Sequence, residues 1–275
     1  MGLRVNTNII SLTAQRELSN VTDRLGGNFR RLSSGLRIAS ASDDAAGLGI
    51  SERMRAQIRS LGQAGRNAND GISLVQTAEG ALNEVTSNLT RMRELSIQAA
   101  NGTLNAGDRA ALDQEFQDLI VEIDRVATQT DFNGIELLDG SEATVSIQIG
   151  TEAGETVDIV LSAMTDGDLG LTGGTFNLDD VTNASAALAT IDTAIDSVTA
   201  FRAELGANQN VLQSSVRSIA TTQENLSAAE SRIRDVDVAA ETADLTRNSI
   251  LQQAAVSVLA QANVQPQLAL SLLQG

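Results

Sequence analysis

The sequence predicts a mainly α-helical fold, in which long antiparallel helices form a rod-like coiled-coil bundle with a small β-hairpin excursion. Apolar residues repeat every seven positions over two long stretches, which is the period of helices that pack side by side. The 275-residue chain has one proline, Pro266, so little interrupts long helices. Alternation of apolar and polar residues is confined to the centre of the chain, where a hairpin is expected.

The strongest repeat lies between residues 188 and 237. Apolar residues follow one another there at intervals of seven without a miss: Ile191, Val198, Leu205, Leu212, Ile219, Leu226 and Ile233. The flanking row of the same helix is mixed, since it includes Arg202, Gln209 and Glu230. A dimeric zipper needs both rows apolar, whereas a bundle with several neighbours tolerates polar residues. This stretch is therefore predicted to be a long helix within a bundle.

Two partner helices are predicted upstream of the centre. The first carries a second row of residues seven apart, namely Leu61, Ala68, Val75, Leu82 and Leu89. The second has an apolar stripe from Leu112 to Val126, and Asp108 near its start interacts favourably with the helix dipole. With the downstream helix, these two complete a bundle of three long amphipathic helices.

The segment of residues 131–180 differs from the rest of the chain. Residues 145–149 and 157–161 alternate between apolar and polar, with Gly154 between them, and this pattern predicts a β-hairpin. Residues 165–175 are rich in Gly, Asp and Thr, which is typical of a loop. The segment has eleven acids and no base, so we expect it to lie in solvent.

The two ends of the chain each resemble a helix whose apolar face has no cover. Near the N-terminus, Leu18, Val21, Leu25, Leu32 and Leu36 recur at helical spacing. From residue 245 to the end there is no acid and a single base, Arg247. Because the long helices before and after the centre run antiparallel, both ends lie at the same end of the bundle. We therefore expect copies of the chain to cover them by self-assembly into an open polymer.

Composition excludes several classes of function. A chain without cysteine or histidine has no thiolate or imidazole chemistry, so neither an enzyme nor a cofactor is expected. The net charge of −16 argues against nucleic acid as a partner. No apolar run is long enough to span a membrane, and no apolar leader opens the chain. Asp43 and Asp44 have no further clustered ligand beside them and are predicted to cap a helix rather than to bind a metal.

Several motifs resemble those of bacterial flagellins. Residues 32–52 (LSSGLRIASASDDAAGLGISE) are similar to the N-terminal flagellin signature, and residues 71–79 (GISLVQTAE) continue it. Residues 131–134 (DFNG), 147–150 (IQIG) and the run from Leu259 to Asn263 also stand where flagellins have them. The resemblance covers essentially the whole chain. Only about thirty residues separate the hairpin from the last long helix, so the resemblance implies a short form that lacks the outer variable domains.

The resemblance implies an extracellular structural subunit of the flagellar filament, a homopolymer of eleven protofilaments. Residues 1–42 and 238–275 would form the inner terminal domain that lines the channel, with filament-core contacts from Leu18, Leu25, Leu32, Leu251, Val258, Leu259 and Leu268. Residues 43–130 and 181–237 would form the rod domain, with 131–180 as its hairpin and acidic loop. The implied partners are other flagellin subunits, an export chaperone, the filament cap and hook-associated proteins, and the implied route is type III export.

The resemblance also implies recognition by the vertebrate innate receptor Toll-like receptor 5. Flagellins that activate this receptor use an Arg, a Leu four residues later and a Glu on the next helix. The matching residues here are Arg91, Leu95 and Glu115. Arg91 and Leu95 fall off the row that contains Leu82 and Leu89, so we expect them to be exposed. The competing interpretation is that these residues serve contacts between subunits.

The alternative function is that of a hook–filament junction protein, since such hook-associated proteins share the terminal helices. The match through residues 32–52 and 71–79, together with the hairpin, favours the filament subunit. The organism, the handedness of the supercoil, glycosylation and the presence of sister flagellins do not follow from the sequence.

Overall fold

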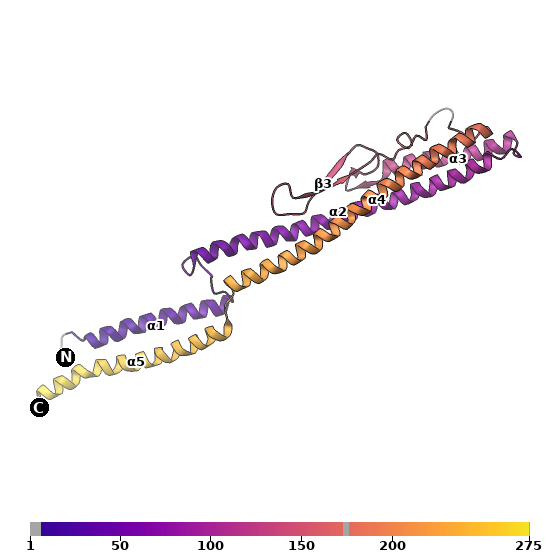
Figure 1. The fold of residues 1–275 in the computed structure, drawn as a ribbon. Helices are drawn as coiled ribbons and strands as arrows, with labels where there is room; N and C mark the ends of the chain where they lie inside the picture. The colour runs from indigo at the N-terminus through magenta and orange to yellow at the C-terminus, as the bar shows by residue number, and fades with distance from the viewer. Residues whose placement is uncertain (1–6, 173–175, 275) are drawn as a thin grey trace. The chain divides into compact units, whose positions relative to one another are not determined.

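The computed structural model describes residues 7–172 and 176–274, with side chains described as far as residue 265. The chain forms two compact units, each described separately. We call residues Gln57–Glu224 the long-helix unit, and the segments up to Ala56 and from Asn225 the terminal unit. The helices shown in Figure 1 are α1 (Ile9–Ser34), α2 (Ala45–Ala99), α3 (Ala106–Gln129), α4 (Val181–Arg234) and α5 (Val238–Gln274). The predicted fold class, mainly α with long antiparallel helices and a small hairpin, is confirmed.

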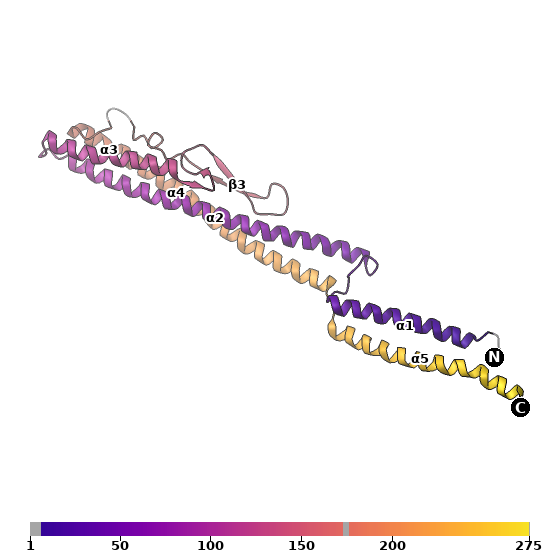
Figure 2. The same cartoon turned by 180° about the vertical axis from the view of Figure 1, so that it is seen from behind.

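In the long-helix unit, α2 and α4 lie side by side and run antiparallel, as the views from both sides show (Figures 1 and 2). Two ion pairs join them, one near the end of α2 and one near the middle of the contact. Arg93 Nε of α2 lies 2.6 Å from Asp192 Oδ1 of α4, and Arg202 Nη2 of α4 lies 3.9 Å from Glu79 Oε1 of α2. Helix α3 packs beside α2, and Arg91 of α2 hydrogen-bonds to Glu115 of α3. A capping box formed by Asn105 and Asp108 lies at the N-terminus of α3.

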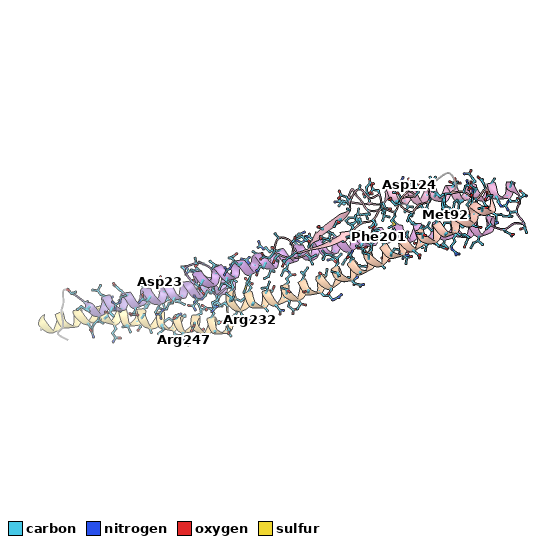
Figure 3. All side chains as sticks on the ribbon, turned by 45° about the horizontal axis from the view of Figure 1, so that its top comes forward. Asp23, Met92, Asp124, Phe201, Arg232 and Arg247 are labelled. Atoms are coloured by element: carbon cyan, nitrogen blue, oxygen red, sulfur yellow. The ribbon has the colours of Figure 1, made fainter. Side chains whose placement is uncertain are left out.

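The core of the long-helix unit contains the two predicted rows of residues seven apart. Of the upstream row, Leu61, Ala68, Val75, Leu82 and Leu89 are all buried. Of the downstream row, Ile191, Val198, Leu205, Leu212 and Ile219 are buried, whereas Leu226 and Ile233 are only half-buried. Met92 and Phe201, which are labelled in Figure 3, belong to the same core. Each large side chain buried in this way contributes about 1.5–3 kcal/mol.

The larger hairpin packs on the helices of the long-helix unit. Strands β3 (Thr144–Gln148) and β4 (Thr156–Val160) are antiparallel, with Val145 opposite Ile159. The tip of this hairpin reaches α2, since Asn67 Nδ2 donates to the carbonyl oxygen of Gln148 at 3.0 Å. The hairpin is therefore tied to α2 within the long-helix unit.

A second, smaller hairpin follows α3. Strands β1 (Asp131–Phe132) and β2 (Ile135–Glu136) are joined by Asn133 and Gly134, whose φ angles are 54° and 80°. Two successive residues with positive φ make the tight turn that suits the twist of a hairpin, and Asn followed by Gly is its usual sequence. The DFNG motif at residues 131–134 therefore forms the turn of this hairpin.

The prediction that residues 131–180 lie in solvent was wrong for their apolar members. The acidic side chains of this segment are exposed or half-buried, as expected. The apolar residues between them are nevertheless part of the core, and these are Leu137, Leu138, Ile159, Leu161, Met164, Leu169, Leu171, Phe176 and Leu178. Charge composition correctly predicted that the carboxylates face solvent. The apolar residues between them pack into the core and thereby hold the backbone of this segment against the helices.

Candidate assembly surface

The terminal unit is built around a pair of antiparallel helices, α1 and α5. At one end of the pair, Asn8 Nδ2 donates to the carbonyl oxygen of Ala262 at 2.7 Å. At the other end, Arg31 Nη2 lies 2.7 Å from Glu241 Oε1. Early residues of α1 thus meet late residues of α5, which places the start of α1 beside the end of α5 as the sequence predicted for the two ends of the chain.

The ends of α1 and α2 are determined by residues of the sequence signature. Helix α1 ends at Gly35, which caps it with a φ of 71°. At the start of α2, Asp44 Oδ1 accepts from the backbone N–H of Gly47 at 2.9 Å, so the predicted capping role is confirmed for Asp44 but not for Asp43. Asp43 Oδ2 accepts from the backbone N–H of Ser40 at 2.9 Å, and the hydrogen bonds from Ser40 lower the pKa of this carboxyl group.

The helix pair leaves many apolar side chains in solvent. On α1 the large exposed apolar residues are Ile9, Ile10, Leu12 and Phe29, and on α5 they are Val238, Ile250, Leu251, Val256, Val258 and Val264. Phe29 and Ile250, each 60% exposed, line a shallow groove on the pair together with Leu25 and Leu245. An apolar surface of this extent on one helix pair is typical of a surface that another chain covers.

The residues predicted for filament contacts divide into two groups. Leu25 is buried between α1 and α5, and Leu18, Leu32 and Leu259 are half-buried there. Leu251 and Val258 are 43% and 55% exposed and are available to another subunit. The side chain of Leu268 lies outside the described residues. The role of all these residues in a filament stays a prediction.

Sequence reasoning missed Asn28, which is buried between α1 and α5. Asn28 lies seven residues after Val21 and three after Leu25, so it occupies an apolar position of the predicted stripe. A polar residue at such a position is the signal that could have identified it, because coiled coils use buried Asn for specificity.

The three residues predicted for receptor recognition differ in exposure. Arg91 of α2 and Glu115 of α3 are roughly half-exposed, and Arg91 Nε donates to Glu115 Oε1 at 2.8 Å. This hydrogen bond, with a second to Glu94 at 3.1 Å, raises the pKa of Arg91. Leu95 is 0% exposed, so the prediction that it is exposed was wrong. Helix α2 packs against both α3 and α4, and its buried face is therefore wider than one row of residues seven apart.

The described part of the chain offers neither a metal site nor a membrane-spanning helix. Within residues 7–172 and 176–274 there is no group of three or more Asp or Glu side chains placed to hold a metal ion. In the same part of the chain, no helix has the length and apolarity that crossing a membrane requires.

Comparison with known proteins identifies the family. The family model of the bacterial flagellin N-terminal helical region matches residues 5–143, and that of the C-terminal helical region matches residues 188–273. The chain is 47% identical over 270 residues to a flagellin of Halalkalibacterium halodurans, and the match covers 98% of this chain and 99% of the relative. The chain belongs to the bacterial flagellin family. It is a short-form flagellin, since twenty residues join β4 to α4 and leave no room for a further domain.

Two further comparisons agree with membership of the flagellin family. The chain is 44% identical over 284 residues to the flagellar filament 33 kDa core protein of Treponema phagedenis, covering 98% of this chain and 99% of the relative. The crystal structure of Bacillus cereus flagellin is similar with a TM-score of 0.51 and 35% identity, covering 60% of this chain and 94% of that one.

Proposed function

We propose that this flagellin is a structural subunit that self-assembles into the extracellular flagellar filament used for motility. The observation that carries the proposal is the exposed apolar surface of α1 and α5, which a single chain does not cover. A second support is the similarity to a relative that is itself a flagellar filament core protein. A role of this kind is structural, and no catalytic activity is proposed.

The distribution of charge supports the same function. The terminal unit has eleven arginines against ten acids, so it is close to neutral. The long-helix unit has eight arginines against twenty-five acids and carries the net charge of the molecule. Burying unpaired charge is costly, so the nearly neutral unit is the one suited to repeated packing inside a polymer.

The finer arrangement follows from the family resemblance. We propose a tube of eleven protofilaments, in which residues 1–42 and 238–275 line the channel, residues 43–130 and 181–237 form the surrounding shell, and residues 131–180 belong to that shell. The compact units of the isolated chain divide instead at Ala56/Gln57 and Glu224/Asn225. Both divisions put α1 and α5 in one body. The proposed partners beyond the subunit itself are an export chaperone, the filament cap and the hook-associated proteins.

The assembly surface can be tested with one charge. Val256 is 51% exposed on α5, so a carboxylate there stays solvated in the single chain but would be buried on assembly. We expect Val256→Glu to abolish filaments seen by electron microscopy while the helix content measured by circular dichroism stays unchanged. Val256→Gln has the same size without the charge and should still assemble. Normal filaments from Val256→Glu would refute the proposed role of this surface.

A junction protein is the competing function, because hook-associated proteins are expected to share the terminal helices. The two products differ in length: a filament subunit forms long tubes on its own, whereas a junction protein stays monomeric or forms one ring. Electron microscopy of the purified chain separates the two. The match to both flagellin family models favours the tube.

Recognition by Toll-like receptor 5 is proposed for the surface around Arg91 and Glu115. These two side chains form a half-exposed ion pair between α2 and α3, which a receptor can contact directly. Leu95 lies beneath this surface and would act by holding α2 in place. A reporter-cell assay with Arg91→Ala and Glu115→Ala tests the site, and unchanged signalling from both variants would favour the competing role in contacts between subunits.

A further inference from the structure

The contact between α1 and α5 contains polar groups that apolar packing does not require. Asn28 of α1 is 2% exposed. Its Nδ2 atom donates to Oε1 of Glu241 at 2.7 Å, and its Oδ1 atom accepts from Nδ2 of Asn248 at 3.1 Å. Both polar ends of this buried amide are therefore matched by groups of α5.

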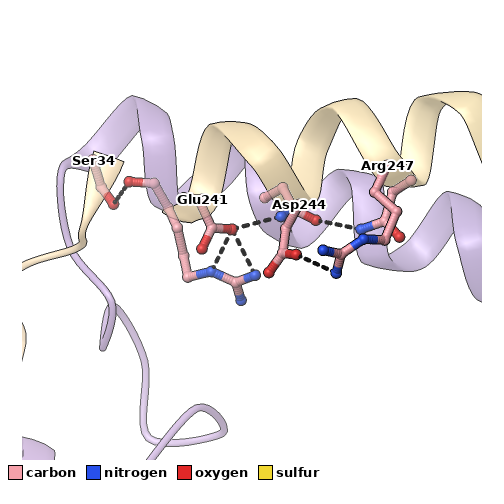
Figure 4. Close-up of polar contacts among 7 residues, drawn as sticks. Ser34, Glu241, Asp244 and Arg247 are labelled. Carbon is pink, nitrogen blue, oxygen red and sulfur yellow. Dashed lines mark hydrogen bonds and ion pairs between the residues drawn. The ribbon is translucent and has the colours of Figure 1, made fainter. Parts of the chain in front are cut away.

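The carboxylate of Glu241 is held by α1 through a second residue. Arg31 Nε donates to the same Oε1 atom at 2.9 Å, and the side chain of Glu241 is only 12% exposed (Figure 4). A carboxylate with so little access to water is stable only while its donors are in place. We call Asn28, Arg31, Glu241 and Asn248 the polar layer. In Figure 4, Asp244 and Arg247 of the same face of α5 pair with each other, at 2.7 Å, and are not part of it.

A smaller set of polar contacts lies at the other end of the helix pair. Ser11 of α1 is buried, and its Oγ atom donates to Oδ1 of Asn263 at 2.8 Å. Asn8 Nδ2 donates to the carbonyl oxygen of Ala262 at 2.7 Å. Polar matches thus occur at both ends of the contact, with the apolar residues Ala14, Val21 and Leu25 buried between them.

The leucine row of α1 does not determine how this helix lies along α5. Leu18, Leu25 and Leu32 repeat at intervals of seven, so a shift by seven residues would place leucine where leucine was. Helix α5 has exposed apolar side chains along its length, and a shifted α1 would meet a similar surface. The hydrophobic effect depends on the area that is buried and has no preferred direction, so it leaves the register open.

We propose that the polar layer, together with the backbone hydrogen bond from the N–H of Val236 to the carbonyl oxygen of Gly35, determines the register of α1 on α5 rather than the strength of their contact. In any shifted register Asn28 and Glu241 would be buried without their partners, and that penalty excludes the alternatives. The register determines where the exposed residues of α5 lie relative to those of α1. The layer would therefore position both halves of the assembly surface, a consequence that rests on the proposed filament function.

Engineered cysteines can measure the register, because the natural chain has none. Ser11→Cys with Asn263→Cys reports the register of the structure, since these side chains are in contact. Ser11→Cys with Val256→Cys reports a shift by seven residues. Intramolecular disulfide is quantified by mass spectrometry in the free chain and in assembled material, with Asn28→Leu/Glu241→Leu as the test background. This double change removes both polar partners together, so it leaves no orphaned carboxylate.

With the polar layer intact, the native pair should exceed the shifted pair by about tenfold, because hydrogen bonds to a charged group are worth that ratio or more. In the Asn28→Leu/Glu241→Leu background this ratio of native to shifted disulfide should fall several-fold, while the melting temperature is unchanged or higher. Asn20→Leu/Glu17→Leu makes the same chemical change on the exposed side of α1 and should keep the native ratio.

An unchanged ratio of native to shifted disulfide in the Asn28→Leu/Glu241→Leu background would overturn the proposal. A parallel loss of both disulfides would also overturn it, because it would mean that the polar layer only stabilises the helix pair. No native disulfide in either state of the otherwise natural chain would refute the helix pair itself. Absence of filaments from the natural chain would instead count against the proposed function, because the disulfide ratio does not depend on assembly.

Discussion

Arg37 donates to the carbonyl oxygen of Ile233 from two nitrogens, Nε at 3.2 Å and Nη2 at 2.6 Å. Ile233 lies in the last turn of α4, where carbonyl oxygens lack partners within the helix. The backbone N–H of Arg37 also donates to the carbonyl oxygen of Arg234 at 2.7 Å, and that of Val236 donates to Gly35 at 3.0 Å. The link between α1 and α2 is therefore tied to the link between α4 and α5.

We predict that Arg37→Ala loosens this connection without unfolding the helices. The change removes two charge-assisted hydrogen bonds, and such bonds are worth about 1.5–3 kcal/mol. Hydrogen exchange at the amides of Arg37 and Val236 should accelerate by about tenfold or more on that basis. Arg37→Lys keeps the charge but lacks the planar fork, so it should restore the protection only in part.

Arg53 offers a matched control for this experiment. It is an exposed arginine of the terminal unit, and its side chain makes no hydrogen bond or ion pair with the described residues. Arg53→Ala should leave both amides unchanged. Equal exchange rates in Arg37→Ala and Arg53→Ala would show that the guanidinium group of Arg37 does not hold the α1–α2 link to the α4–α5 link.

The second prediction concerns two glycines of α2 in different surroundings. A Cβ atom at Gly71 would lie 3.1 Å from Ile147 Cγ1 and 3.3 Å from Leu212 Cδ1, so the hairpin and α4 would have to move. A Cβ atom at Gly80 would meet nothing within 4 Å. Gly80→Ala should stabilise the protein by about 1 kcal/mol through helix propensity. Gly71→Ala should destabilise it, because overpacking costs about 1–3 kcal/mol.

Urea unfolding followed by circular dichroism measures both free energies. The two substitutions are chemically identical and lie in one helix, so opposite signs can only come from the surroundings of each Cβ atom. Stabilisation of equal size in both variants would mean that the hairpin is not packed against Gly71 in solution.

Periodicity predicted the long helices because a repeat of apolar residues every seven positions can be recognised within one helix. The helices that pack against it need not be known. It identified the buried rows that contain Leu82 and Leu205, and alternation identified both strands of the β3–β4 hairpin. The same periodicity failed at Leu95, since the width of a buried face depends on how many helices pack against it. That number is a tertiary property and is not encoded in a single row.

The candidate site could be predicted only in outline for a similar reason. The exposed apolar faces of α1 and α5 follow from a tail without charge. Asn28 and Glu241 are more than two hundred residues apart, and their hydrogen bond depends on the register of two helices from opposite ends of the chain. Local sequence carries no information about that pairing beyond the presence of a polar residue on an apolar stripe.

The third prediction is a pH dependence at Asp124, which is labelled in Figure 3. Burial and the neighbouring carboxyl group of Asp166 raise the pKa of Asp124 above its ordinary value of 3.8. A carboxyl group whose pKa is raised by folding favours the native state below its unfolded value, and this contribution is lost as the pH rises through the folded value. Asp124→Asn should therefore stabilise the protein at neutral pH, with a gain that shrinks as the pH falls towards about 4.

Unfolding by urea across this pH range gives the difference between the natural chain and Asp124→Asn. Asp70 is the control, because it is an exposed carboxylate of α2 that makes no polar contact within the described part of the chain. Asp70→Asn should not show the same trend. A gain that grows as the pH falls would contradict the assignment of Asp124.

The last prediction separates structure from recognition at the proposed receptor surface. Leu95 is fully buried, whereas Ile97, two residues along α2, is 51% exposed. Leu95→Ala should cost about 2–5 kcal/mol of stability through the cavity that it leaves. Ile97→Ala should cost less than about 0.5 kcal/mol, as surface changes usually do. Leu95→Met conserves most of the volume and should cost less than about 1.5 kcal/mol.

If Leu95 acts only by supporting Arg91, receptor signalling in the reporter assay should follow stability. Leu95→Met should then signal normally, whereas Leu95→Ala should be impaired. Loss of signalling in Leu95→Met at unchanged stability would instead mean that the receptor contacts Leu95 itself.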